Sequence, residues 1–276
     1  MFLAVDRNEF NNLFSNITRW FQVNSLSLNL NKTHFMHFQT STNVKNCVNK
    51  DFKTKHINKV YSTNFLGVIL DSTFSWGPHI NNLASKLNSA CYLIRCLQFL
   101  LPIETLRMVY FSNFHSLLSY GIIFWGNSSH SDTIFKLQKR SIRIIMRVGN
   151  NVSCRELFRR LNILSLCSQY ILSLLLFVVK KNIDMFTLSS TVHSFNTRRC
   201  FDLHLPAVHL TKVQKGIYYS GAKVFNSLPP SIKCLSNDIR RFKSTLKKFL
   251  FEGSFYTVQE SFDCSSSNNP KLEKFY

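Results

Sequence analysis

The side chains of this sequence that are best suited to binding a ligand are mainly cations. Four of them follow one another at spacings of four, three and four residues, so they share one face of a predicted helix. These four are Lys136, Arg140, Arg143 and Arg147. Lys139 flanks them, and the next predicted helix adds Arg155, Arg159 and Arg160 with Glu156 as its only acid. Such a row can track phosphate groups while reading little base sequence; an ordinary solvated helix face is the alternative.

Two other groups of residues could contact nucleic acid. The first is a second, weaker basic row near the C-terminus, made of Arg240, Arg241, Lys243, Lys247 and Lys248. The second is a pair of aromatic side chains, Tyr218 and Tyr219, beside Lys215 and Lys223. Bases stack on such rings. Most other aromatic residues lie at helical core spacing, which favours packing over binding.

Metal ligands are poorly represented. Cys200, His204 and His209 could supply three ligands, but no fourth follows at a suitable spacing. His34 and His37 are three residues apart in a predicted strand, so they point to opposite faces. The sequence therefore predicts no metal site.

The overall charge agrees with a polyanionic partner. The 276 residues contain 34 Lys and Arg against 14 Asp and Glu, which gives a net charge of +20. A soluble protein does not need so large an excess to stay in solution. Nucleic acid is the first choice of partner, an anionic membrane surface is the second, and a merely basic surface is the third.

Most of these cations lie on predicted helices. Apolar residues at spacings of three and four predict helices over 10–21, 80–97, 102–125, 132–148, 154–161 and 164–179, and a last one after the capping Asp238. Alternation predicts strands at 26–30, 35–39 and 60–70. Residues 40–59 and 184–197 read as a loop and a linker, and 262–276 as a frayed tail. The fold class is therefore α+β, predominantly helical.

The longest apolar run, 170–179, is far shorter than the ~20 residues of a membrane span. No signal peptide is visible after Met1, and the eight cysteines show no Cys-x-x-Cys pair. We expect an intracellular protein with reduced thiols and no membrane partner, in either nucleus or cytoplasm.

Several ordered motifs carry a resemblance to a known family. They are WFQVNSLSLNLNKTHFMHF from Trp20, FLGVILD from Phe65, WGPHI from Trp76, LPIETLRMVYFSNFHSLLSYG from Leu101, LQKR from Leu137, NTR from Asn196 and FNSLP from Phe225. Each motif is weak alone, but their order and spacing resemble the reverse transcriptases of non-LTR retrotransposons of the jockey-like kind. The resemblance extends to about Glu260.

The resemblance implies an organisation and two site residues. Residues 1–75 would be the C-terminal edge of a polymerase palm, a remnant of its sheet, and 76–130 would be thumb-like helices. A basic helical region would follow at 131–183, a C-terminal region at 184–260 and a flexible tail at 261–276. Lys32 would lie where such polymerases place a lysine close to the departing pyrophosphate, as an auxiliary catalytic group. Gly67 would belong to the primer grip, which contacts nucleic acid.

This sequence departs from the family pattern in its carboxylates. Such polymerases hold two metal ions with a pair of aspartates, and that Asp-Asp loop would precede Met1. The acids of the palm-like part, Asp6, Glu9, Asp51 and Asp71, are unpaired. We therefore expect a truncated RNA-directed DNA polymerase, inactive alone and without a cofactor of its own; Mg²⁺ is expected for a full-length relative. The expected partners are RNA and DNA, as an RNA–DNA hybrid. The alternative is a non-enzymatic, basic RNA-binding or interaction protein derived from a retroelement.

Overall fold

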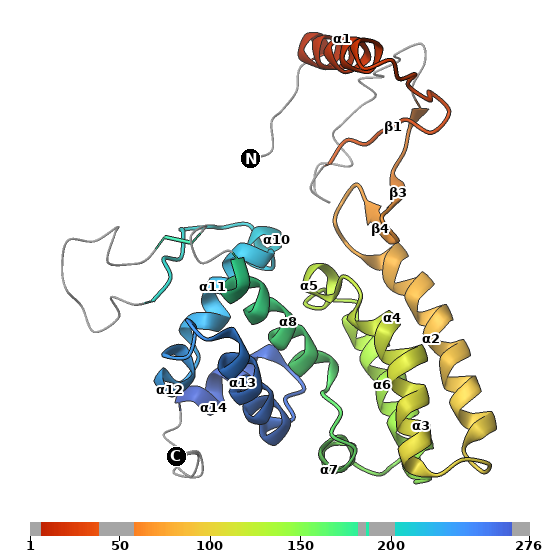
Figure 1. Ribbon diagram of the computed structural model, residues 1–276, viewed down its shortest axis with the longest axis vertical. Coiled ribbons are helices and arrows are strands. Elements are labelled where there is room, and N and C mark those ends of the chain that lie inside the picture. The colour runs from red at the N-terminus through yellow and green to blue at the C-terminus, as the bar shows by residue number, and fades with distance from the viewer. Residues whose placement is uncertain (1–6, 39–57, 182–185, 188–201, 267–276) are drawn as a thin grey trace, which may run out of the picture. The chain divides into compact units, whose positions relative to one another are not determined.

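The computed structural model describes residues 7–38, 58–181, 186–187 and 202–266 (Figure 1). The chain divides into two units, Met1–Pro78 and His79–Tyr276, and each is described by itself below. Helices dominate both the element order and the core, and the described part of the first unit adds four short strands. This confirms the predominantly helical α+β class.

The described residues of the first unit form one helix and two strand pairs. Helix α1 spans Arg7–Val23. Strands β1 (His34–Phe35) and β2 (Asn58–Lys59) pair in parallel. Strands β3 (Ser62–Phe65) and β4 (Val68–Asp71) form an antiparallel hairpin in which Phe65 lies opposite Val68. The strand expected at 60–70 is thus two strands, because Leu66 and Gly67 form a two-residue turn with φ of 48° and 81°. Positive φ at both central residues is the requirement of the type I′ hairpin turn.

The strand predicted at 26–30 is wrong. The segment after α1 is irregular, and it tightens into a turn at residues 30–32. The carbonyl and the side-chain oxygen of Asn29 both accept from the backbone N–H of Lys32, at 3.1 and 3.2 Å. Asparagine side chains often bond to nearby backbone groups in this way and so compete with strand pairing. The alternating leucines therefore did not indicate a strand.

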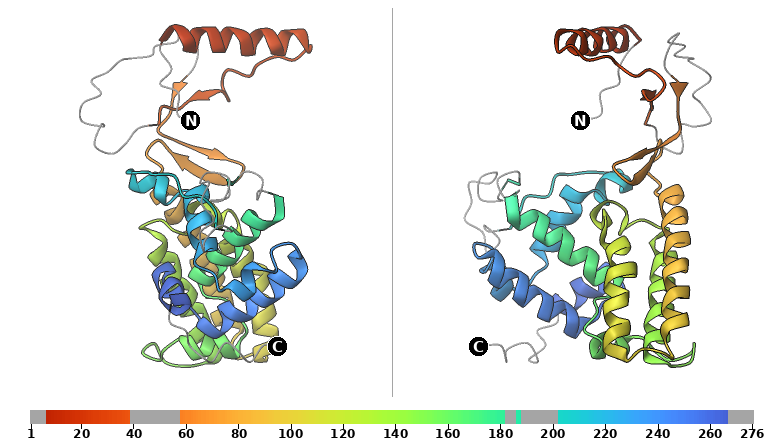
Figure 2. Two further views of the ribbon diagram at one scale, coloured as in Figure 1. Left: turned by 90° about the vertical axis from the view of Figure 1, so that its left-hand side faces the viewer. Right: turned by 45° about the vertical axis from the view of Figure 1, so that its right-hand side comes forward.

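The described residues of the second unit form helices and loops, with an isolated bridge residue at Leu203. Its longer helices are α2 (Gly77–Leu97, beginning at the boundary between the units), α6 (Ser131–Met146), α8 (Leu166–Lys181), α11 (Ile217–Asn226) and α13 (Ile239–Gly253). Its shorter helices are α5 (Ile122–Trp125), α7 (Arg155–Arg160), α10 (Thr211–Gln214), α12 (Pro230–Lys233) and α14 (Val258–Ser266). Helix α8 lies between the others: it contacts α11 and α13 most, and also α5, α6 and α14 (Figure 2). Its Leu174, Leu175 and Val178 are fully buried.

The helix predicted over 102–125 is segmented. It consists of α3 (Ile103–Val109), a π-helical turn η2 (Tyr110–His115), α4 (Ser116–Ser119) and then α5. The break before α5 falls at Gly121, whose φ is 61°. Glycine takes this left-handed conformation without steric cost. The π turn buries Tyr110 and Phe114 on one side, where the two rings stack with centroids 5.2 Å apart.

Some sequence expectations lie outside the described residues. These are the capping role of Asp6, the loop over 40–57 and most of the predicted linker. The frayed tail predicted from residue 262 is wrong over its first residues, because α14 continues to Ser266. Among the described helices, none combines the length and the apolar character needed to cross a bilayer.

Candidate nucleic-acid interface

Helix α6 presents its basic row on the side away from the core. Ile134, Ile142 and Ile145 are fully buried, whereas Lys136 and Arg140 are exposed. The orientation depends on one buried amide. Gln138 Nε2 donates to Tyr110 Oη at 3.0 Å and to the Leu164 carbonyl at 2.9 Å, and its Oε1 accepts from the Leu166 N–H at 2.7 Å. These three bonds fix α6 against η2 and the start of α8.

The last two arginines of the row, Arg143 and Arg147, donate hydrogen bonds to carbonyls of nearby loops. Arg143 Nε donates to the Val152 carbonyl at 3.0 Å, and Arg147 Nη2 donates to the Leu101 carbonyl at 3.0 Å. Arg147 also ends the helix in a left-handed conformation with φ of 55°. A guanidinium carries five N–H donors. Each of these arginines therefore has donors left for a phosphate.

Lys139 and Arg155 contact a tyrosine from the C-terminal part of the unit. Lys139 Nζ lies 4.6 Å from the Phe135 ring centroid and 5.7 Å from that of Tyr256, and Arg155 Cζ lies 4.6 Å from the latter. Arg155 also pairs with Glu260 at 3.4 Å. These cation–π and ionic contacts connect α6 and α7 to the segment that leads into α14.

Arg159 is likewise engaged within the protein. It pairs with Glu156 and donates twice to the Glu252 carbonyl, at 2.7 and 3.1 Å. Its contacts join α7 to the end of α13. Lys139, Arg155 and Arg159, which the sequence assigned to nucleic acid, thus have structural contacts that no spacing rule indicates.

The remaining cations have no hydrogen bond or ion pair to any described residue. They are Lys136, Arg140 and Arg160, all exposed. Arg140 has a further cationic neighbour that the sequence analysis missed, Arg95 on α2. Burial raises the pKa of the Cys91 thiol to about 11, and the charges of Arg140 and Arg95 both oppose this rise. The two arginines thus lie around the same thiol, which itself contacts the Leu137 carbonyl of α6. We call Arg95, Lys136 and Arg140 the α2–α6 patch.

The second basic row lies on α13 as predicted. Asp238 caps this helix, and its Oδ1 accepts from the N–H groups of Arg240 and Arg241 at 3.0 and 3.1 Å. Phe242, Leu246 and Leu250 are fully buried on the opposite face. The outward cations are Arg240, Arg241, Lys243 and Lys248, with Lys247 half-buried.

In the first unit, both residues suggested by the resemblance lie in turns. Lys32 is exposed in the turn before β1, and Gly67 is the second residue of the β3–β4 turn. The conformation of that turn alone explains the glycine. The structure therefore adds no contact that links either residue to catalysis or to a primer.

Asp71, the acid that ends β4, is used by the chain itself. Its carboxylate accepts from Thr73 Oγ1 at 2.6 Å and from the backbone N–H groups of Ser75 and Trp76 at 2.9 and 3.0 Å. Burial raises its pKa, but these hydrogen bonds outweigh burial and leave the pKa below the usual 3.8. Asp71 thus shapes the turn that precedes α2.

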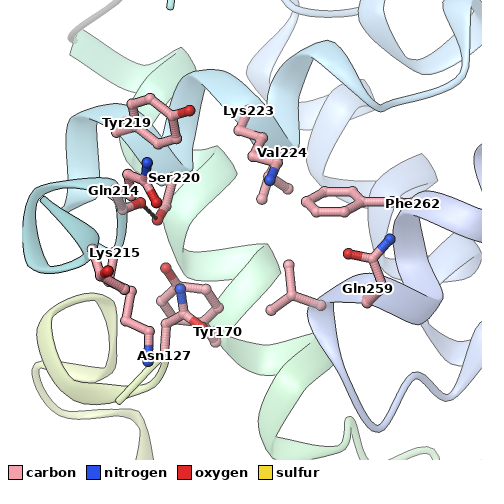
Figure 3. Close-up of a pocket in the computed structure, with 12 residues that line it drawn as sticks. Asn127, Tyr170, Gln214, Lys215, Tyr219, Ser220, Lys223, Val224, Gln259 and Phe262 are labelled. Carbon is pink, nitrogen blue, oxygen red and sulfur yellow. Dashed lines mark hydrogen bonds between the residues drawn. The ribbon is translucent and has the colours of Figure 1, made fainter. Parts of the chain in front are cut away.

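The two adjacent tyrosines have separate surroundings. Tyr218 packs against Phe177 and Phe186. Tyr219 lines a pocket together with Lys215 and Lys223 (Figure 3). Among the described residues no group of three His, Cys, Asp or Glu side chains could hold a metal ion, and Cys200 of the weak ligand set lies outside them.

Comparisons with family models, with curated proteins and with solved structures find no match for this chain.

Proposed function

We propose that the second unit binds the phosphate backbone of nucleic acid, with an RNA–DNA hybrid as the preferred duplex, as the primer–template-holding part of a non-LTR retrotransposon reverse transcriptase would. The observation that carries this proposal is the α2–α6 patch, three exposed cations on adjacent helices. Lys136 and Arg140 are exposed and make no hydrogen bond or ion pair to another described residue. They are available to an external anion.

The chemistry of the patch fits phosphate rather than base recognition. Its members are Lys and Arg on rigid helices, without an aromatic ring or an amide among them. Such cations neutralise phosphates and release counterions, so affinity falls steeply with salt. Arg143 and Arg147 extend the surface along α6 with the donors left over from their carbonyl contacts.

Polymerisation is not assigned to any described residue. The auxiliary catalytic role of Lys32 rests on the resemblance alone. Magnesium ions would be bound by carboxylates other than Asp71. The rival function is a non-enzymatic RNA-binding or interaction protein. The engagement of Asp71 in its turn favours that rival over catalysis by the first unit.

The test is a salt series of hybrid binding, measured by fluorescence anisotropy. The double variant Lys136→Gln/Arg140→Gln should bind more weakly at low salt. The slope of log K against log salt should fall by about two, since each lost phosphate contact removes about 0.9. The matched control Lys180→Gln/Lys212→Gln removes the same charge from exposed positions on α8 and α10 and should leave affinity and slope nearly unchanged.

Two results would contradict the proposal. The first is an equal loss of hybrid affinity in the control variant, which would show that the effect comes from net charge and not from the α2–α6 patch. The second is binding to vesicles rich in anionic lipid without binding to the hybrid, which would favour the membrane-surface alternative. Comparing the hybrid with duplex RNA of the same sequence separates the reverse-transcriptase proposal from the RNA-binding rival.

A further inference from the structure

A pocket of about 240 Å³ lies within the second unit, apart from the α2–α6 patch. Helices α8, α10, α11 and α14 and the turn after α5 all contribute side chains to it (Figure 3). Since α10 and α11 are consecutive, these five elements come from four separate stretches of the sequence that converge on one hollow. The volume lies just below the range of about 300–1,000 Å³ that holds drug-sized ligands. The pocket has room for a small ring system.

The charge of the lining is positive. Lys215 and Lys223 both line the pocket, and none of the other described lining residues is a carboxylate. The Lys223 ammonium lies 5.4 Å from the ring centroid of Phe262, which helps to hold it at the wall. Both lysines are exposed, so an anionic group at the rim could reach them without being fully desolvated. The lining therefore favours an anion.

The remaining walls are suited to a planar ring with polar edges. Tyr219 and Phe262 stand on different sides of the hollow, and Gln214 and Gln259 carry amides into its lining (Figure 3). The Nε2 groups of both amides already donate within the protein, to the Val208 carbonyl at 2.8 Å and to Asp263 at 3.2 Å. Their Oε1 atoms are acceptors that could receive an amino or imino proton.

A buried hydroxyl without a well-aligned hydrogen-bond partner lies at the base of this pocket. Tyr170 is only 1% exposed, and its Oη has no partner at full hydrogen-bond geometry among the described residues. Burial raises its pKa to about 12, and hydrogen-bonding contacts with the Ser220 and Asn127 side chains oppose part of the rise. Native proteins seldom leave a buried polar group without a partner, and such a group calls for an explanation. A ligand in the pocket would supply that partner.

We propose that this pocket binds one nucleotide unit, with its base between the aromatic walls and its phosphate at Lys215 and Lys223. The proposal rests on the pocket's own residues. It adds to the proposed backbone binding a second site that takes a single, unstacked base. Stacking on an aromatic side chain accepts any of the four bases, so the site need not select a sequence.

The experiment uses the full chain and the four ribonucleoside 5′-monophosphates as probes, with ribose 5-phosphate as the abasic control, in ligand-observed NMR titrations. At least one nucleotide should bind about ten-fold more tightly than ribose 5-phosphate, because base stacking adds to the phosphate contact. Lys223→Gln should weaken nucleotide binding by about three- to five-fold, the range of an exposed ion pair. Tyr219→Leu should weaken it by about ten-fold.

Lys212→Gln is the matched control, because Lys212 lies on α10 beside the pocket but does not line it. It should leave the affinity unchanged, and thermal unfolding shows whether each variant folds. Lys223→Gln keeps the test valid if Tyr219→Leu does not fold, since its side chain is exposed. No advantage of nucleotides over ribose 5-phosphate, or an equal effect of Lys212→Gln and Lys223→Gln, overturns the pocket proposal.

The outcomes also separate this site from the proposed function. Hybrid binding that depends on Lys136 and Arg140, without nucleotide binding, overturns the pocket alone. Nucleotide binding that depends on Lys223, without hybrid binding, supports the pocket and overturns the backbone interface.

Discussion

At the scale of single residues, one fully buried polar side chain makes three hydrogen bonds to other segments. Gln138 is 0% exposed and satisfies a tyrosine hydroxyl, a carbonyl and an N–H group from two other segments. Gln138→Leu should lower the free energy of unfolding by about 3 kcal/mol, because it leaves three buried groups without their partner. Urea unfolding measures this. Gln169→Leu, at a half-buried position with one 3.3 Å bond to Ser173, is the control and should change stability by about 0.5 kcal/mol or less. Equal effects would mean that the network contributes nothing specific.

Two histidines, His79 buried and His115 half-buried, give the stability of the protein a pH dependence. Burial, with Lys247 nearby, lowers the pKa of His115 below its usual 6.5, and burial with Lys86 nearby lowers that of His79. Because the unfolded chain binds these protons more readily, the stabilisation is complete above the unfolded-state pKa and is lost as pH falls below about 6.5. The double variant His79→Gln/His115→Gln should therefore lose less stability than the wild type between pH 7.5 and 5. Denaturant unfolding at both pH values measures this, and equal losses would contradict the assignment.

At the scale of elements, α13 depends on its cap. Asp238→Ala removes the acceptor for two N–H groups at the start of the helix, and it should lower the free energy of unfolding by about 1 kcal/mol. Asp238→Asn keeps an oxygen at the same place, so most of the stability should remain. The exposed pair between Asp238 and Arg241 at 3.4 Å contributes little to the difference. Urea unfolding of both variants separates capping from charge, and equal loss in both would assign the effect to the charge.

The helices could be predicted from the sequence because each is amphipathic over several turns. The stripe of α6 and the capping residue of α13 are local signals, and both predictions agree with the structure. Predictions failed where one residue changes the backbone. Asn29 turns the chain where leucines alternate, Gly67 folds one expected strand into a hairpin, and Gly121 ends a helix that the apolar pattern continues.

Residue spacing also predicts the basic row, but it does not show which of its cations are free to bind a ligand and which stabilise the fold. Which cations face solvent and which hold the fold depends on partners far along the chain. Arg147 bonds to the Leu101 carbonyl, Arg159 to the Glu252 carbonyl, and Arg155 contacts Tyr256. Arg95 joins the patch only because α2 and α6 bring their cations around the thiol of Cys91. Such juxtapositions are tertiary, so no spacing rule predicts them.

At the scale of the whole molecule, positive charge and exposed apolar surface have opposite effects on self-association. A net charge of +20 keeps copies of the chain apart at low salt. Yet the stripe of α1 is open: Leu13 is 50% exposed, Ile17 48% and Trp20 58%. The two described strand pairs of the first unit also consist of edge strands alone, which readily pair with other chains. We therefore predict self-association that strengthens as salt screens the repulsion, whereas hybrid binding weakens under the same conditions.

Light scattering across a salt series measures this self-association. Leu13→Gln/Trp20→Gln should lower the average mass toward the 32.2 kDa of one chain, because it removes the apolar stripe without adding charge. The matched control Phe99→Gln/Leu100→Gln changes two residues that are 81% and 77% exposed between α2 and α3. If the control lowers the mass equally, the effect comes from general surface polarity and not from α1. A monomer at every salt concentration would contradict the prediction, and it would mean that the charge outweighs the open stripe and the strand edges even when screened.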